Sequence, residues 1–183
     1  QIDYATHYAY DRAARFIIQN LRLTPRSSEA QQVRHWSVET DVDARLRRSD
    51  DAFGNIVHTL YTERPTEVLT LRVTGTVTTS HTGGVLKSEP ERLSPLVYLR
   101  DTPLTEADAD LRDFAADIGP GEPLERLHRL MGAIHERVAF KVGATTADHT
   151  AAEAFAQKQG VCQDHAQIFI ACARRLGTPA RYV

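Results

Sequence analysis

Hydrophobic residues change their spacing once along this chain, and that change restricts the folds open to it. Up to residue 88 they recur at every second position, which is typical of β-strands, and from residue 104 they recur at every third or fourth position, which is typical of amphipathic helices. Segment 89–103 between them holds three prolines, and proline interrupts both regular structures. We therefore expect an α+β fold with a β domain at 1–88, a connector at 89–103 and a helical domain at 104–183.

The first region contains several short alternating runs separated by turn residues. Residues 4–10 and 69–77 alternate most regularly, and residues 36–46 place four apolar side chains on what is predicted to be one strand face. Residues 50–55 contain the Asp, Gly and Asn that tolerate the backbone of a tight reversal. Short strands at this spacing predict an antiparallel β-sandwich.

Four helices are predicted in the second region, and each has a start signal. In chain order the signals are Thr105, Pro123, the capping-box pair Thr150 and Glu153, and the glycine before Cys162. Gly177 ends the last helix, because glycine favours the left-handed conformation that terminates helices. Residues 180–183 then resemble the first residues of a strand.

Cys162 is the residue whose position most strongly indicates chemistry. Gly160 permits a close approach of loop to helix, so Cys162 is expected in the first helical turn. The unpaired N–H groups and the helix dipole at that end favour the thiolate, which is the nucleophilic form, and the same N–H groups suit an oxyanion. A free cysteine is also often a small buried hydrophobic residue, so the spacing by itself leaves both interpretations open.

Gln163, Asp164 and His165 are the expected neighbours of the site. Asp164 would complement the positive helix end, but its charge would also oppose thiolate formation, so its net role stays open. His165 lies on a similar helical face to Cys162, yet two side chains in one helical turn rarely align for proton transfer. We expect His165 to pack or hydrogen-bond rather than to act as a base. Cys172, further along the same helix, is predicted to be core packing.

Composition argues against several other classes of function. The 183-residue chain is 42% hydrophobic and 25% charged with a formal net charge of −2, so a basic face for nucleic acid or a membrane surface is not expected. The spacing of Cys, His and Gly residues shows neither a metal-ligand pattern nor a phosphate-binding loop, so no metal and no cofactor are expected. Two late cysteines make no disulfide framework, and no signal peptide is recognised from Gln1 onward, which predicts a reducing, cytoplasmic setting. A periplasmic protein whose signal peptide has been removed is the alternative with the same sequence features.

Two regions of the chain are similar to a known family. Residues 150–183, with Gly160-Val-Cys162-Gln-Asp-His and the closing Leu-Gly-Thr-Pro-Ala-Arg-Tyr-Val, closely resemble the cysteine motif of the bacterial transglutaminase-like superfamily. Residues 21–26 and 51–55 resemble the β-rich N-terminal region that accompanies that domain. The two matches occur in the expected order and together cover nearly the whole chain.

This resemblance implies a papain-like fold, of which residues 104–183 are the helical half, and a Cys-His-Asp triad with Cys162 as nucleophile. The family's His and Asp normally lie on strands beyond the last residues of this chain, so the resemblance implies a chain truncated before them and inactive alone. It implies a parent cysteine-dependent amide hydrolase or peptidase, or an acyl transferase, acting on a peptide or protein amide. The alternative is a non-catalytic binding or scaffolding module with a degenerate transglutaminase-like domain.

Truncation would have a physical consequence. The last two helices would normally pack on the missing sheet, so we expect Phe169, Ile170 or Tyr182 to be exposed. An apolar surface of this kind predicts a homodimer.

Overall fold

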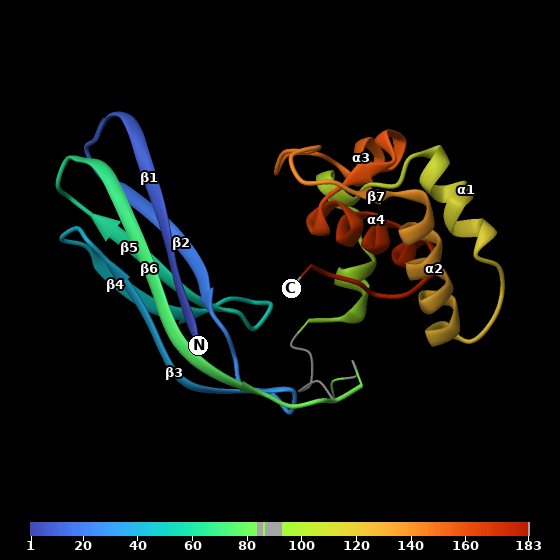
Figure 1. The fold of residues 1–183 in the computed structure, drawn as a ribbon, viewed down its shortest axis with the longest axis horizontal. Helices are drawn as coiled ribbons and strands as arrows, with labels where there is room; N and C mark the ends of the chain where they lie inside the picture. Colours follow the sequence, from blue (N-terminus) through green and yellow to red (C-terminus); the bar gives the residue numbers. More distant parts are fainter. Residues whose placement is uncertain (84–85, 87–92, 183) are drawn as a thin grey trace. The chain divides into compact units, whose positions relative to one another are not determined.

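The computed structural model describes residues 1–83, 86 and 93–182 (Figure 1). The chain divides into two compact units, Gln1–Leu93 and Ser94–Val183. The first is built from strands and the second mainly from helices, so the predicted α+β class is confirmed. Residues 89–92 of the expected connector lie outside the described residues, and the chain from Ser94 onward belongs to the second unit.

Two three-stranded antiparallel sheets form the N-terminal unit. Its strands are β1 (Ile2–Ala14), β2 (Ile17–Thr24), β3 (Gln31–Thr40), β4 (Arg45–Asp50), β5 (Ile56–Thr62) and β6 (Thr66–Thr79). One sheet has the order β1-β6-β3 and the other the order β2-β5-β4. The alternation at residues 69–77 is confirmed, because Leu69, Leu71 and Val73 of β6 are all buried. Leu69 and Leu71 share one apolar cluster with side chains of β2 and β5, so both sheets contribute to a common core.

The prediction that residues 36–46 form one strand face is wrong. β3 ends at Thr40 and β4 begins at Arg45, and the two strands belong to different sheets. Asp41 leaves β3 and its carboxylate accepts a 2.8 Å hydrogen bond from the N–H of Thr70. Apolar residues on both sides of this turn still pack on the same core, which is why they had the spacing of a single strand.

Gly75 leaves the space that the indole ring of Trp36 occupies. The two residues lie opposite each other on β6 and β3, and a Cβ atom at position 75 would lie 2.2 Å from Trp36 Cε3. Trp36 Nε1 donates a 2.9 Å hydrogen bond to the carbonyl of Leu23 on β2. The ring therefore links the two sheets, and it needs glycine beside it.

We expect Gly75→Ala to destabilise the N-terminal unit by about 2–3 kcal/mol, because the ring must move and its N–H then loses the Leu23 carbonyl. Trp36 is the single tryptophan of the chain, so its fluorescence during denaturant unfolding measures this unit. Thr74→Ala is the control on the opposite face of the strand and should cost less than about 1 kcal/mol. An unchanged unfolding midpoint for Gly75→Ala would show that the ring has room to move.

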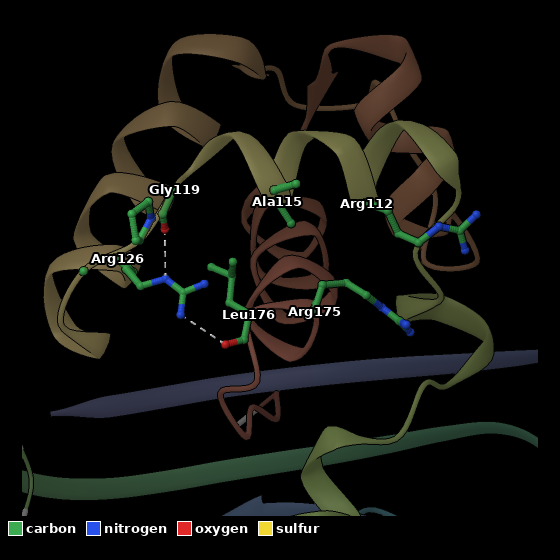
Figure 2. Close-up of a pocket in the computed structure, with 9 residues that line it drawn as sticks. Arg112, Ala115, Gly119, Arg126, Arg175 and Leu176 are labelled. Atoms are coloured by element: carbon green, nitrogen blue, oxygen red, sulfur yellow. Dashed lines mark hydrogen bonds between the residues drawn. The ribbon is translucent and has the colours of Figure 1, made fainter.

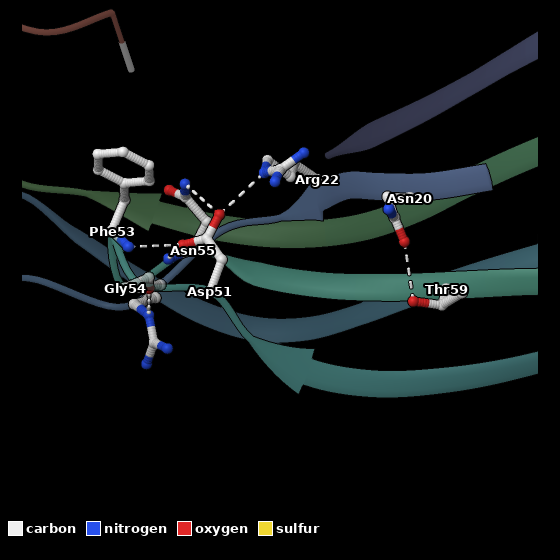
Figure 3. Close-up of polar contacts among 8 residues, drawn as sticks. Asn20, Arg22, Asp51, Phe53, Gly54, Asn55 and Thr59 are labelled. Atoms are coloured by element: carbon white, nitrogen blue, oxygen red, sulfur yellow. Dashed lines mark hydrogen bonds and ion pairs between the residues drawn. The ribbon is translucent and has the colours of Figure 1, made fainter.

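The turn between β4 and β5 is organised around the carboxylate of Asp51 (Figure 3). Its Oδ1 accepts hydrogen bonds from the N–H groups of Phe53 and Asn55, each at 2.9 Å. Its Oδ2 accepts from the Asn55 side chain at 3.0 Å and from Arg22 Nε at 2.9 Å. The hydrogen bonds from Asn55, and then that from Arg22, hold the pKa of the Asp51 carboxyl well below its usual range.

This turn explains why segments 21–26 and 51–55 stand out together in the sequence. Arg26 donates to the carbonyl of Gly54, and Gly54 has the positive φ of 80° that the reversal requires. Arginines of segment 21–26 therefore bind the turn that segment 51–55 forms. Backbone geometry and hydrogen bonding account for the residue types of both segments.

The C-terminal unit is built around its last helix. Its elements are η1 (Pro95–Leu99), η2 (Pro103–Thr105), α1 (Ala109–Asp117), α2 (Pro123–Arg137), β7 (Ala139–Phe140), α3 (Ala151–Gln157), β8 (Gln159–Gly160) and α4 (Cys162–Arg175). Ile168, Ala171 and Cys172 of α4 are fully buried and belong to one cluster with side chains of α1, α2 and α3. Within the described parts of the chain, no helix has both the length and the apolar character that a membrane crossing requires.

Helix α1 begins later than predicted. Thr105 ends the 3₁₀ turn η2, and Glu106 after it has an extended backbone with ψ of 129°. The cap is Asp108, whose Oδ1 accepts a 2.9 Å hydrogen bond from the N–H of Leu111. Pro103 begins this short 3₁₀ turn and the backbone is extended after it, so the α-helix starts separately, after Asp108.

The end of the chain departs from one expectation and meets another. Residues 180–182 form no strand, and Val183 lies outside the described residues. Exposure was expected for Phe169, Ile170 or Tyr182, and Tyr182 is 60% exposed, whereas Phe169 is half-buried and Ile170 is only 4% exposed. The exposed aromatic residue therefore lies after α4, and the helix itself buries Ile170 within this unit.

Arg174 connects the end of α4 to three other segments. Its guanidinium donates to the carbonyl of Tyr98 at 2.9 Å, to the carbonyl of Ala180 at 2.9 Å and to Thr105 Oγ1 at 2.7 Å. Desolvation by burial lowers the pKa of this guanidinium, and the charge of Asp101 opposes that effect. The position of Arg174 near the end of α4 would by itself indicate only an interaction with the helix dipole. Its hydrogen bonds show that it also links α4 to the other three segments.

Candidate active site

Cys162 is the first residue of α4, as the sequence predicted, and its side chain is exposed. The two-residue strand β8 leads directly to it. β8 pairs in parallel with β7, and the hydrogen bond from the N–H of Lys141 to the carbonyl of Gly160 is 2.8 Å long. The approach to Cys162 is therefore held by a second chain segment, and the thiol lies at a helix N-terminus open to solvent.

Asp164 holds the loop that precedes Cys162. The side chain is 1% exposed, and its Oδ2 accepts a 2.7 Å hydrogen bond from the N–H of Val161 and a 2.5 Å hydrogen bond from Thr145 Oγ1. Its Oδ1 is buried and has no hydrogen-bond partner in the described part of the chain. Asp164 thus satisfies the backbone at the helix start, which is one half of a capping box.

Gly160 is required by the same carboxylate. A Cβ atom at this position would lie 2.6 Å from Asp164 Oδ2 and 2.7 Å from Asp164 Cβ. The close approach predicted for this glycine is therefore an approach to a buried side chain of the helix itself.

His165 has both ring nitrogens directed at backbone carbonyls. Nδ1 lies 2.9 Å from the oxygen of Val161, and Nε2 lies 3.0 Å from the oxygen of Val138 at the end of α2. The ring also faces Phe140, with 6.3 Å between the ring centroids. A carbonyl oxygen only accepts hydrogen bonds and a neutral imidazole has one N–H, so the ring donates to one of these two carbonyls while its other nitrogen also lies against backbone.

Gln163 attaches the start of the helix to the preceding loop. Its Nε2 donates a 3.1 Å hydrogen bond to the carbonyl of Ala147. Together with Thr145 on Asp164, this gives the loop between β7 and α3 two bonds to the first turn of α4. Sequence reasoning missed Thr145, because nothing in the spacing of a threonine 19 residues before Asp164 indicates the contact.

Cys172 differs from Cys162 in burial and in its position along the helix. It is fully buried, and its thiol donates to the carbonyl of Leu111 with 3.8 Å between the heavy atoms. Desolvation, and secondarily the charge of Asp108, raises its pKa to about 12. It is core packing, as the sequence predicted, and it stays a thiol near neutral pH.

A separate cavity of about 600 Å³ lies between the ends of α1 and α4 and the start of α2 (Figure 2). Its charged lining residues are Arg112, Arg126 and Arg175. Arg126 donates to the carbonyls of Gly119 and Leu176, Arg112 donates to the Ala107 carbonyl, and Arg175 pairs with Asp101. The Arg126 bonds complement the C-terminal ends of α1 and α4, and Arg112 and Arg175 have their own partners, so all three arginines are accounted for without a ligand. Over residues 1–83, 86 and 93–182, no three Cys, His, Asp or Glu side chains are grouped to hold a metal ion.

Comparison with known families gives two matches in chain order. Residues 1–78 match the bacterial transglutaminase-like N-terminal region, and residues 112–183 match the transglutaminase-like superfamily. The chain belongs to the transglutaminase-like superfamily. The helical unit with Cys162 is therefore part of a transglutaminase-like core, and the β unit is the N-terminal region that accompanies it in bacteria.

Relatives and a solved structure extend this result. Uncharacterised proteins of Mycobacterium tuberculosis and Mycobacterium bovis are 30% identical over 200 residues, and one of Mycobacterium leprae is 26% identical over 197. The matches cover 100% of this chain and 64% of the first two relatives, or 69% of the third. A crystal structure described as a “putative cysteine protease” from Cytophaga hutchinsonii matches 97% of this chain and 62% of its own with a TM-score of 0.73. At 18% identity this likeness confirms the transglutaminase-like fold.

Proposed function

We propose that Cys162 is the nucleophile of a cysteine-dependent enzyme that hydrolyses peptide or protein amides or transfers their acyl groups. The observation that carries the proposal is the contrast between the two cysteines. Cys162 is exposed at the first position of α4, whereas Cys172 is buried in the middle of the same helix with a pKa of about 12. A helix N-terminus favours the thiolate and offers N–H groups to an oxyanion.

The chemistry is acyl transfer in two steps. The Cys162 thiolate attacks the amide carbonyl, the C–N bond breaks, and the leaving amine takes a proton from a general acid. The resulting thioester is released by water in hydrolysis or by a second amine in transfer. Both outcomes share the nucleophile, and they differ only in the acceptor. Because both cysteines are free thiols, a reducing compartment such as the cytoplasm suits this chemistry.

We assign the general base, and the carboxylate that orients it, to residues outside this chain. His165 is the histidine nearest to Cys162 in sequence, and both of its ring nitrogens contact carbonyl oxygens. A base must reach the thiol proton directly or through one water. The histidine and aspartate that the superfamily resemblance implies would complete the triad.

The test is an amide hydrolysis assay on the protein extended to the length of its mycobacterial relatives. We expect Cys162→Ser to lower kcat by about 10⁴-fold or more, because the nucleophile is lost. Cys172→Ala is the matched control and should keep activity within a few-fold. The 183-residue chain alone should show no hydrolysis that depends on Cys162.

Thiol alkylation of the 183-residue chain supplies an independent control. Near neutral pH iodoacetamide should modify Cys162 and leave Cys172 unmodified, since its pKa of about 12 leaves almost no thiolate. Hydrolysis by Cys162→Ser at the parent rate would contradict the proposal. A folded extended protein that hydrolyses no amide would favour the binding or scaffolding alternative.

A further inference from the structure

We infer that Asp164 and His165 are positioning residues that together fix the backbone of Val161 and thereby hold Cys162 at the helix start. The inference rests on the proposed function only in the role that it gives to Cys162. Neither residue is placed in contact with the reacting atoms.

Both polar groups of Val161 are held by side chains of the helix that Cys162 begins. Its N–H donates to Asp164 Oδ2 at 2.7 Å, and its carbonyl oxygen lies 2.9 Å from His165 Nδ1. The backbone N–H of His165 also donates to that carbonyl at 3.1 Å. The Val161 N–H and C=O belong to two planar peptide groups, one on each side of the Val161 Cα. Holding both groups restricts rotation about the φ of −107° and the ψ of −175° that direct the chain into α4.

The same two side chains are anchored at their other ends. Thr145 donates to Asp164 Oδ2 from the loop before α3, and the carbonyl oxygen of Val138 at the end of α2 lies 3.0 Å from His165 Nε2, so the nitrogen that carries the ring hydrogen decides whether Val161 or Val138 accepts it. Gly160 leaves the space that the Asp164 carboxylate fills. Val161 is therefore connected through Asp164 and His165 to two segments distant in sequence.

Stability alone does not explain a carboxylate at position 164. Its Oδ1 is buried and has no partner in the described part of the chain, and such groups are uncommon because they are costly. Its negative charge also lies close to a thiol that must ionise in order to react. What Asp164 supplies is a fixed position of the Val161 backbone, since its Oδ2 accepts hydrogen bonds from Val161 and Thr145 at the same time.

Two variants at position 164 separate charge from position. Asp164→Asn and Asp164→Ala both remove the charge, but only asparagine keeps an oxygen that can accept from Val161. In the 183-residue chain near neutral pH, we expect iodoacetamide to alkylate Cys162 of Asp164→Asn at least as fast as in the parent. Asp164→Ala should be about tenfold slower than Asp164→Asn, because Cys162 no longer stays at the helix N-terminus.

Amide hydrogen exchange measured by NMR gives the local readout. The Val161 N–H should lose protection in Asp164→Ala and keep it in Asp164→Asn, while the Ile168 amide in the buried part of α4 stays protected in both. His165→Phe, which keeps a ring beside Phe140, should slow alkylation in the same direction. If Asp164→Ala does not fold, Thr145→Val removes a single donor and should slow alkylation about fivefold.

Equal alkylation rates for Asp164→Ala and Asp164→Asn would overturn the inference, as would a Val161 amide that exchanges equally slowly in both. If Thr145→Val is the variant that has to be used, an alkylation rate equal to the parent's overturns it. None of these readouts requires amide hydrolysis. Failure of the positioning effect is therefore observed separately from failure of the proposed enzyme.

Discussion

Gly160→Ala is expected to destabilise the C-terminal unit by about 2–4 kcal/mol. Its φ is not among the positive values found at other glycines, so the cost is steric rather than conformational. The new methyl group would lie 2.6 Å from Asp164 Oδ2, 2.7 Å from its Cβ and 2.9 Å from its Cγ. The Cβ is attached directly to the helix backbone, so either α4 or β8 must shift, and the hydrogen bond from Val161 to Asp164 is lost.

Far-UV circular dichroism at the helix band during denaturant unfolding measures this effect, because the helices belong to the C-terminal unit. Gly132→Ala is the matched control in α2. That glycine is exposed, has no atom within 4 Å of an added Cβ and does not have a positive φ. It should stabilise the unit by about 0.5–1 kcal/mol, because alanine is the better helix former. The same sign for both variants would contradict the packing assigned to Gly160.

Arg174→Met is expected to destabilise the same unit by about 2–4 kcal/mol. The methionine fills similar volume but leaves the carbonyls of Tyr98 and Ala180 and the hydroxyl of Thr105 without their guanidinium donor. Tyr98 and Thr105 are buried, so water does not easily replace the lost bonds. The expected result is a lower unfolding midpoint in the same circular dichroism experiment.

Arg175→Met is the control at the next position of the helix. Arg175 is exposed and pairs with Asp101 at the surface, so its loss should cost less than about 1 kcal/mol. Both variants remove one positive charge near the C-terminus of α4 and have the same effect on the helix dipole. Equal losses for the two would mean that the dipole, and not the tertiary bonds, explains Arg174.

Local signals were read correctly from the sequence where the cause is itself local. The capping box is one example: Thr150 Oγ1 accepts from the N–H of Glu153 at 3.2 Å, and the Glu153 carboxylate accepts from the N–H of Thr150 at 2.9 Å. The hydrogen bonds that Thr150 donates to this carboxylate, from its backbone N–H and then from its hydroxyl, lower the pKa of Glu153. The start of α4 at Cys162 is a second example, since the glycine two residues before it and the periodic apolar face after it are both features of the local sequence.

Predictions were wrong where a neighbouring element competes with the local signal. Thr105 has the residue type of a helix cap, but η2 uses it, and Asp108 caps α1 instead. Residues 36–46 have the spacing of one strand face because two strands of different sheets pack their apolar residues on the same core. Spacing along a chain records which residues face a core, and it does not record how often the chain turns between them.

The sequence by itself determined the two-part organisation, the superfamily and the position of Cys162 at a helix start, because spacing, caps and motifs are local properties of the chain. Only the tertiary structure decided what the neighbours of Cys162 do. Asp164 and His165 face Val161, Thr145 and Val138, and Thr145 and Val138 are distant in sequence. Hydrogen bonds between distant segments form only when packing brings donor and acceptor within about 3 Å, and a sequence of residue types does not contain that distance.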